Sequence, residues 1–351
     1  MRAGRIATLL AGMVAGLLAC GGTGSARDDD GNRPDAVADE AVADLPAETA
    51  HDLPAEAGLP AGPARIAVVT DTHLWMDDTF ANNVHWIEAI RTLASQDPAW
   101  DRIVSTGDNI DDLFTAPFAL QEWLDGTGDP VEILVHYRGL VDAHAPSIFR
   151  ILLGNHDVRY FDTFEGNGPP LAAWAKAFQG SPAYPGPWWS EEVRGCRLVA
   201  LQSNDLATNH ADNDLATFGA AQLAWLEQQL TSDRPTIVFW HVFIEPPADG
   251  ETPPEVMQVL ARHPGPGDRV VFTGHEHEFR RYQWQGVRFY QGGSLAASAA
   301  WVHQVECDGE TGAITILNEA DLPYSDPPLP RQVQFRVQFR DSHHNWRPNP
   351  M

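Results

Sequence analysis

Arg65-Ile-Ala-Val-Val-Thr-Asp-Thr-His73 is the stretch from which the architecture is most readily inferred. Its first six residues form a β-branched apolar run after Pro63, which predicts a buried strand over residues 65–70. The residues that follow offer a carboxylate and an imidazole. Ligand sites of open α/β sheets lie just outside the carboxyl ends of the strands, so this pattern predicts a site at such an end.

The same alternation continues along the chain. Strands are predicted over residues 102–106, 147–153, 197–203, 236–240 and 269–273, and helices over residues 82–94, 117–125, 131–143 and 220–230. From Phe279 to Leu317, short strands separated by Gly-containing turns predict antiparallel hairpins. We therefore expect a mixed α/β fold, built as one domain around a mixed sheet core.

Five of the six strands in the α/β part are followed by side chains that can bind a metal ion. Most of these motifs are weak alone, because a single histidine or a Gly-Asp pair after a strand is usually structural; Gly154-Asn-His-Asp157 is more specific, since Asn and His offer adjacent donors after a tight turn. Their occurrence in order, each at the end of a separate apolar strand, predicts a metal site. The candidate residues are Asp71 and His73, Asp108 and Asp111, Asn155 and His156, His241, and His275 and His277.

Composition excludes several classes of function. The 351 residues include 48 acidic and 23 basic side chains, a formal net charge of −25. A chain of this charge lacks the basic surface that binding nucleic acid needs, and we expect no nucleic-acid partner. An acidic protein that binds an anionic substrate needs local positive charge, which metal ions supply. Three cysteines exclude a disulfide scaffold and a Cys-rich zinc module.

The N-terminus reads as a lipoprotein signal peptide over residues 1–20. Arg2 and Arg5 precede an apolar run from Ile6 to Leu18, which is too short to span a bilayer. Leu17-Leu-Ala-Cys20 resembles a bacterial lipobox, so Cys20 is the expected lipidation site; the alternative is ordinary cleavage near Ala19. We expect a chain that crosses the inner membrane and stays in the bacterial cell envelope, attached to a membrane through this lipid.

The remaining chain divides into three segments. Residues 21–63 are rich in Ala, Asp, Glu and Pro and predict a disordered acidic linker. Residues 64–317 form the predicted folded domain. Residues 318–351 form a Pro-rich extension in which the alternation over 331–340 predicts one strand. Cys196 and Cys307 are expected to be two buried free thiols; a disulfide is the alternative.

The ordered motifs Asp-x-His, Gly-Asp-x-x-Asp, Gly-Asn-His-Asp, His and Gly-His-x-His resemble the calcineurin-like metallophosphoesterase superfamily over about residues 65–290. The resemblance implies a four-layer α-β-β-α sandwich with two mixed sheets. Thr70–Leu74 and Gly219–Leu226 look like the bacterial cyclic-nucleotide phosphodiesterase branch, although His241 stands alone where relatives often have consecutive histidines. Asp111 occupies the position at which purple acid phosphatases place a tyrosine.

The resemblance also implies how the site residues divide. One divalent metal would bind Asp71, His73 and His277, the other Asn155, His241 and His275, and Asp108 would bridge both. These oxygen and nitrogen donors suit Mn²⁺, Fe²⁺, Zn²⁺ or Mg²⁺ without selecting one. A hydroxide held between the metals would attack phosphorus. His156 would protonate the leaving oxygen while Asp111 fixes its tautomer, and Asp157 is expected to cap its loop.

The expected function is metal-dependent hydrolysis of a small-molecule phosphodiester or phosphomonoester. Two alternatives remain open: a phosphate-scavenging phosphomonoesterase or nucleotidase, and a non-catalytic surface interaction lipoprotein on the same scaffold. Selectivity for the substrate is not readable from the sequence. Four residues near predicted loop ends are expected to be structural: Trp75, Asn204, His210 and Phe243.

Overall fold

The computed structural model describes residues 51–53, 62–74, 81–110, 131–158, 171–203, 216–248, 250–265, 267–295, 301–321, 339–340 and 346–347. The chain divides into two units, residues 1–45 and 46–351, and every described residue belongs to the second. Several predictions fall outside the described residues. They concern the signal peptide with Cys20, most of the linker, the helix over 117–125, and Trp75, Asp111, Asn204 and His210.

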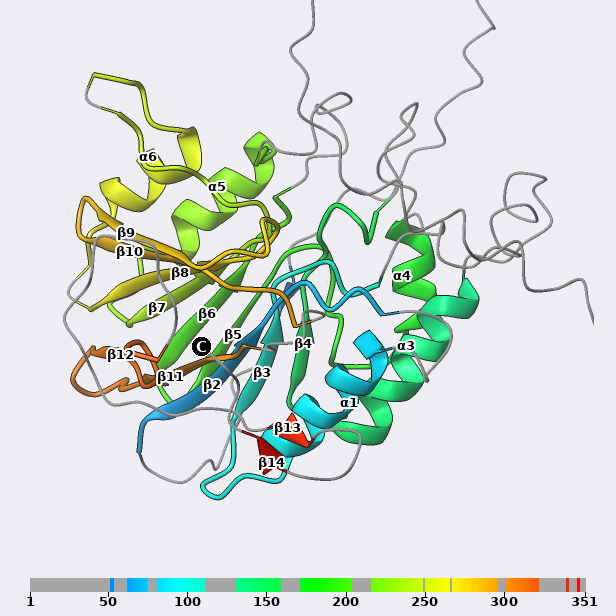
Figure 1. Ribbon diagram of the computed structural model, residues 1–351. Helices are drawn as coiled ribbons and strands as arrows, with labels where there is room; N and C mark the ends of the chain where they lie inside the picture. Colours follow the sequence, from blue (N-terminus) through cyan, green and yellow to red (C-terminus); the bar gives the residue numbers. More distant parts are fainter. Residues whose placement is uncertain are drawn as a thin grey trace, which may run out of the picture. The chain divides into compact units, whose positions relative to one another are not determined.

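Two mixed β-sheets form the centre of the second unit (Figure 1). The smaller sheet has the order β12-β11-β2-β3-β4. Its strands are β2 (Ala64–Val69), β3 (Arg102–Ser105), β4 (Phe149–Ile151), β11 (His303–Cys307) and β12 (Ile314–Ile316). Strands β2, β3 and β4 are parallel, and β11 runs antiparallel to β2 and to β12.

The larger sheet has the order β1-β5-β6-β7-β8-β10-β9. Its strands are β1 (His51–Asp52), β5 (Trp189–Val193), β6 (Cys196–Ala200), β7 (Thr236–Phe239), β8 (Arg269–Thr273), β9 (Arg280–Trp284) and β10 (Val287–Gln291). Strands β6, β7, β8 and β10 are parallel, whereas β5 and β9 run antiparallel to their neighbours β6 and β10.

Helices cover the outer face of each sheet. On the smaller sheet lie α1 (Ala81–Ala94), α3 (Val131–His144) and α4 (Leu171–Ala177), and on the larger sheet lie α5 (Ala220–Gln229) and α6 (Glu255–Arg262) (Figure 1). Separate apolar clusters fill the three interfaces, and the middle one lies between the sheets. The predicted mixed α/β fold with two mixed sheets in four layers is confirmed.

Some elements were not predicted. Helix α4 and strand β5 lie in stretches without a clear periodic pattern, whereas α6 does carry apolar residues at helical spacing, Val256, Met257, Val259 and Leu260. Residues 51–53 belong to the predicted disordered linker, yet Leu53 donates its backbone N–H to the Ser190 carbonyl at 2.8 Å and β1 pairs with β5. The prediction of disorder is therefore wrong for these three residues, because the free edge of β5 offers them backbone partners. In the extension, β13 (Phe339–Arg340) pairs with β14 (Trp346–Arg347).

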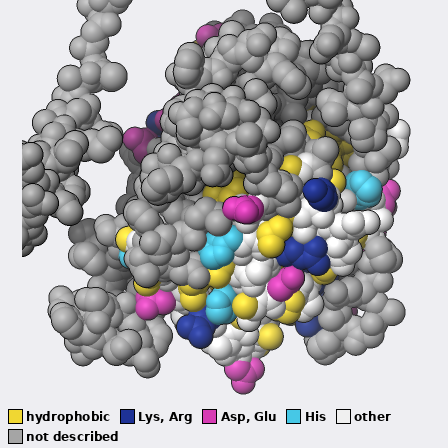
Figure 2. All heavy atoms as spheres, turned by 90° about the vertical axis from the view of Figure 1, so that its right-hand side faces the viewer, with side chains coloured by type: hydrophobic (Ala, Val, Ile, Leu, Met, Phe, Trp, Pro, Cys, Tyr) yellow, Lys and Arg dark blue, Asp and Glu magenta, His cyan; other side chains and the backbone are white. Residues whose placement is uncertain are grey.

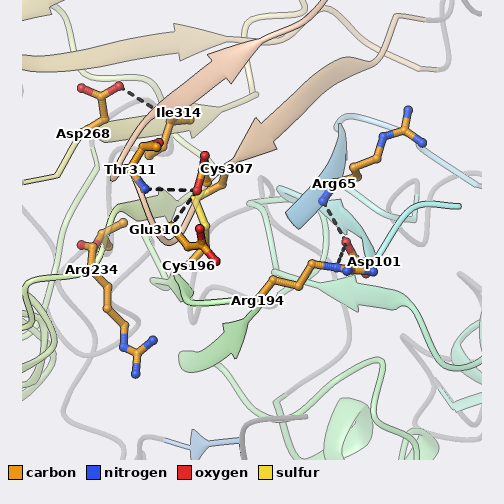
Figure 3. The surroundings of a disulfide bond; sticks show 12 residues. Arg65, Asp101, Arg194, Cys196, Arg234, Asp268, Cys307, Glu310, Thr311 and Ile314 are labelled. Carbon is orange, nitrogen blue, oxygen red and sulfur yellow. Dashed lines mark hydrogen bonds and ion pairs between the residues drawn. A yellow bond between two sulfur atoms is a disulfide. The ribbon is translucent and has the colours of Figure 1, made fainter. Parts of the chain in front are cut away.

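The two domain cysteines form a disulfide, so the expectation of two free thiols is wrong (Figure 3). Cys196 begins β6 in the larger sheet, and Cys307 ends β11 in the smaller one. The packing of the sheets brings their Cα atoms to 6.2 Å across 111 residues of sequence. The bond joins the two sheets at the amino ends of the central parallel strands, away from the predicted ligands.

Buried charges near that amino end are paired. Glu191 of β5 accepts hydrogen bonds from Arg102 of β3 and Arg150 of β4, with Nε–Oε2 distances of 2.9 and 3.0 Å. Asp101, just before β3, accepts from the Arg65 backbone N–H at 2.9 Å and from Arg194 Nε at 2.9 Å (Figure 3). The contacts of Glu191 with the two arginines and of Asp101 with Arg194 cross between the sheets, so they support the same junction as the disulfide.

The outer surface over α1, α3 and α4 carries mixed charge. Figure 2 shows acidic, basic and histidine side chains interspersed on the coloured part of this face. Arg138 and Asp142 on α3, for example, form an exposed pair at 3.2 Å. In the described part of the chain, no helix has both the length and the apolar character needed to cross a membrane.

Candidate metal centre

The candidate ligands lie where the carboxyl ends of strands from both sheets meet. The register aligns Val69, Ser105 and Ile151, the last residues of β2, β3 and β4. The loops that follow these strands carry Asp71 and His73, Asp108, and Asn155 and His156. The loops after β7 and β8 in the other sheet carry His241, and His275 and His277.

Asp71, His73 and His277 form the first ligand group. The Nε2 atoms of the two imidazoles lie 3.0 Å apart, and His277 Nε2 lies 3.4 Å from Asp71 Oδ1. The donor atoms of all three residues fall within 4.8 Å of one another, which is close enough to bind one ion. The residues come from loops of both sheets, so only the folded chain assembles this group.

Asn155, His241 and His275 form the second ligand group. Asn155 Oδ1 lies 3.0 Å from His241 Nε2 and 2.9 Å from His275 Nδ1. The three donor atoms therefore converge on a common point.

Asp108 lies between the two groups. Its Oδ2 atom is 3.8 Å from His73 Nε2 and 3.2 Å from His241 Nε2. Its side chain is almost fully buried. One carboxylate is thus within reach of ions held by either group.

Five candidate ligands have backbone conformations that non-glycine residues rarely adopt. The φ angles are +52° at Asp71, +43° at His73, +50° at Asp108, +81° at His275 and +55° at His277. Only two other non-glycine residues of the described chain have positive φ. Such strain persists where the surrounding structure enforces it and is concentrated at functional sites. The clustering of strain on the ligands supports a functional role for this end of the sheets.

Two glycines allow the loops to approach one another. A Cβ on Gly154 would lie 2.2 Å from Asp108 Oδ1, and one on Gly107, whose φ is +123°, would lie 2.5 Å from His241 Nδ1. No larger residue fits at either position without moving a ligand. This requirement explains the glycine that begins the motifs Gly107-Asp108 and Gly154-Asn155.

Neighbouring groups orient the ligands. His241 Nδ1 donates to the Thr106 carbonyl at 3.1 Å, which leaves Nε2 directed at Asn155 and Asp108. Ser203 Oγ accepts from the backbone N–H groups of His241 and Val242. No local motif singles out Ser203, although it lies at the end of a predicted strand, where supporting residues of a site are expected.

The centre is rich in negative charge that needs a cation. Burial raises the pKa of Asp108, but the charge of His241 outweighs this and holds it well below its usual value. Burial would lower the pKa of His241, but Asp108 raises it to about 9. Among the described residues, Asp71 and Asp108 form ion pairs only with histidines. Within the described part of the chain, the positive charge near these carboxylates therefore comes from imidazolium or from metal ions.

The donor chemistry fits divalent metal ions. Carboxylates, imidazoles and an amide oxygen are present, and no thiolate is among them, a set that suits Mn²⁺, Fe²⁺, Zn²⁺ or Mg²⁺. Two acceptor oxygens face His241 Nε2, and two imidazole Nε2 atoms face each other in the first group. At each of these two places, oxygen and nitrogen lone pairs from several side chains point at one position, where a cation would be bound.

His156 and Asp157 lie beside the ligands. The His73 and His156 rings meet edge to face with centroids 4.8 Å apart, and the His156 backbone N–H donates to Asp108 Oδ1 at 2.9 Å. His156 also lies within ligand distance of His73 and Asp108. The buried Asp157 carboxylate accepts from backbone N–H groups of its own loop and of the loop after β3, so the expected capping role is confirmed.

The family model of the calcineurin-like phosphoesterases matches residues 64–279. The chain belongs to this family. Membership implies divalent metal ions, and the matched segment contains every ligand candidate described above. The comparison with curated proteins gave no match.

Solved structures with the same kind of fold are distant from this chain. Purple acid phosphatase PPD1 from yellow lupin (Lupinus luteus) is 12% identical, with a TM-score of 0.49. A putative 5'-nucleotidase from Staphylococcus aureus is 16% identical, with a TM-score of 0.47. Each match covers 73% of this chain and 53% of the other, so this chain spans about half their length. Phosphopantetheinyl hydrolase from Mycobacterium tuberculosis is 15% identical, covering 69% and 96% of the chains, with a TM-score of 0.38.

Proposed function

We propose that this protein hydrolyses phosphoesters with two divalent metal ions, one held by each ligand group and both by Asp108. The observation that carries the proposal is the position of Asp108, whose Oδ2 lies 3.8 Å from His73 Nε2 and 3.2 Å from His241 Nε2. A carboxylate between two separate sets of convergent donors is the arrangement that a shared bridging ligand requires.

The ions, when bound, would activate water and neutralise the phosphoryl oxygens. Residues of the chain would position the ions and protonate the leaving group. The strained loops would hold the ligands in place before substrate arrives, and His156, beside the first group, would donate a proton to the leaving oxygen. Asp111, which lies outside the described residues, is proposed to orient the His156 ring.

The direct test measures metal content and activity of the full-length chain together. We expect two equivalents of divalent metal per chain and hydrolysis of bis(p-nitrophenyl) phosphate or p-nitrophenyl phosphate that a chelator abolishes. A chain that binds no metal and cleaves no phosphoester with Mn²⁺, Fe²⁺, Zn²⁺ or Mg²⁺ would refute the proposal and favour the non-catalytic interaction lipoprotein.

The same assay separates the remaining substrate classes. Preference for bis(p-nitrophenyl) phosphate and cyclic nucleotides would place the chain with the phosphodiesterase branch that Thr70–Leu74 and Gly219–Leu226 resemble. Preference for the monoester and for nucleoside monophosphates would favour a phosphate-scavenging phosphomonoesterase or nucleotidase.

The proton-donor role of His156 has a test of its own. His156→Ala should slow hydrolysis of esters with poor leaving groups by about 10²-fold or more, since these need protonation. It should slow nitrophenyl esters much less, because nitrophenolate leaves without a proton. His263→Ala, at the end of α6, is the matched control. Equal loss on both kinds of ester would contradict the assignment.

We further propose that the chain is exported and lipidated at Cys20. The Cys196–Cys307 disulfide supports export, because disulfides persist in oxidising compartments. In a bacterial host, the wild-type protein should sediment with membranes and Cys20→Ser should not. An unchanged distribution in Cys20→Ser would contradict the lipid anchor.

A further inference from the structure

A buried polar pair, Asn109 and Asp157, joins the loop after β3 to the loop after β4. Asp157 Oδ1 accepts from the backbone N–H of Asn109 at 2.9 Å and of Ile110 at 3.1 Å. Its Oδ2 accepts from the backbone N–H of Gly154 at 2.8 Å. One carboxylate therefore binds main-chain donors from both loops.

The side-chain amide of Asn109 is fully used. Its Nδ2 donates to the Leu152 carbonyl at 2.6 Å and to Asp157 Oδ2 at 2.7 Å. Its Oδ1 accepts from Ser105 Oγ at 2.6 Å and from the Tyr137 hydroxyl of α3 at 3.0 Å. An amide has two donors and two acceptor sites, so this one has a single satisfied orientation. The pair is thereby anchored to β3, β4 and α3.

This connection determines how close Asn155 comes to Asp108. It holds the loop after β4 where a Cβ on Gly154 would lie 2.2 Å from Asp108 Oδ1. The loop after β2 is attached differently, because its backbone N–H groups bond the carbonyls of Asp108 and Asn109 at 2.8 to 3.0 Å without Asp157. The side chains of the pair therefore join the loops after β3 and β4, whereas the loop that carries Asp71 and His73 is attached to main-chain carbonyls.

Building on the proposed function, we propose that Asn109 and Asp157 are positioning residues for the second metal ion. They hold Asn155 against Asp108 and so set the affinity of the second ligand group without contacting the ion. An isosteric Asp157→Asn change turns an acceptor oxygen into an N–H group facing other N–H groups. It should weaken the second ion and spare the first.

The test is titration of the full-length chain with Mn²⁺, followed by equilibrium dialysis and electron paramagnetic resonance. The wild type should bind two Mn²⁺ with the spectrum of an exchange-coupled pair. Asp157→Asn should bind the first ion as before and the second at least tenfold more weakly, with a mononuclear spectrum at one equivalent.

Two further variants keep the result interpretable. Asp101→Asn is the matched control: Asp101 also accepts a backbone N–H, but at the opposite end of β3, and both ions should stay bound. Tyr137→Phe removes one bond to Asn109 and should weaken the second ion several-fold in a chain that folds normally. Unchanged binding of both ions in Asp157→Asn, or equal weakening of both in Tyr137→Phe, would overturn the proposal. A wild-type chain without a coupled pair would instead refute the proposed function.

Discussion

Buried carboxylates have different partners at the two ends of the central parallel strands. At the carboxyl ends, Asp71 and Asp108 are buried with histidines as their only ion-pair partners in the described chain, and five ligand candidates have strained backbones. At the amino ends, Glu191 is paired with two arginines and a disulfide joins the sheets. At the carboxyl ends, the negative charge of the buried carboxylates needs added cations. At the amino ends, arginines of the chain itself balance it.

The residues expected to bind metal and those expected to stabilise the fold therefore lie at opposite ends of the central strands. Strain and unbalanced charge lower the stability of the folded state, and they persist when the rest of the structure enforces them. The disulfide and the buried ion pairs lie between the same two sheets and hold them together. We therefore expect changes at the carboxyl ends to alter metal binding and rate, and changes at the amino ends to alter the free energy of unfolding.

The largest effect is expected from Asp108→Asn. Removing the shared carboxylate charge should abolish binding of at least one ion and lower kcat/KM by on the order of 10³-fold. Metal analysis and kinetics on bis(p-nitrophenyl) phosphate measure both effects. Asp142→Asn on the exposed face of α3 is the control, and full metal content in Asp108→Asn would contradict the bridging assignment.

Glu191→Gln should lower the free energy of unfolding and leave metal binding unchanged. It leaves Arg102 and Arg150 buried without a counter-charge, which should lower the free energy of unfolding by about 3–5 kcal/mol. Mn²⁺ stoichiometry in the folded fraction should stay at the wild-type value. Glu192→Gln, on the same strand but half-exposed, should cost under about 1 kcal/mol. Urea denaturation of the three chains provides the comparison, and loss of metal in Glu191→Gln would show that the two ends are coupled.

Removing the disulfide should have a somewhat smaller effect. The double variant Cys196→Ser with Cys307→Ser releases a cross-link that spans 111 residues, and should lower the free energy of unfolding by about 2–4 kcal/mol. Metal affinity at 25 °C should not change. Thermal denaturation with and without Mn²⁺ tests both statements. A variant as stable as the wild type would show that the sheets need no cross-link.

The smallest effect is in the pH dependence of stability. Burial raises the pKa of Glu191, but hydrogen bonds from Arg102 and the charge of Arg150 hold it below the usual 4.5. A carboxyl whose pKa is lower in the folded chain stabilises it above the unfolded pKa, and this contribution is lost as the pH falls through the folded value. Between pH 6 and 3 the wild type should lose more stability than Glu191→Gln. Parallel curves would contradict the paired state of Glu191.

The sequence predicts the mixed α/β fold, which the structure confirms, and it singles out the candidate ligands one by one. Each candidate lies in a loop after an apolar strand, so the local pattern alone was enough to propose Asp71, Asn155 and His275. Their strained φ angles were not predictable, because they arise where loops from two sheets are pressed together. The same holds for Asn109, whose neighbours in the sequence give no hint that its partners come from β3, β4 and α3.

Long-range pairings account for the errors. Cys196 and Cys307 are separated by 111 residues, and only the stacking of two sheets brings them together. Strand β1 was missed because a polar, Pro-flanked segment has no strand pattern of its own and is ordered by the edge of β5. Such features depend on the assembled layers, which sequence periodicity does not describe.

The shared metal centre is tested most directly by the anomalous diffraction of Mn²⁺ in crystals of the full-length protein. We expect two peaks, one on each side of the Asp108 carboxylate, with the first and second ligand groups around them. A single peak, or peaks away from Asp108, would contradict the shared metal centre on which the proposed function rests.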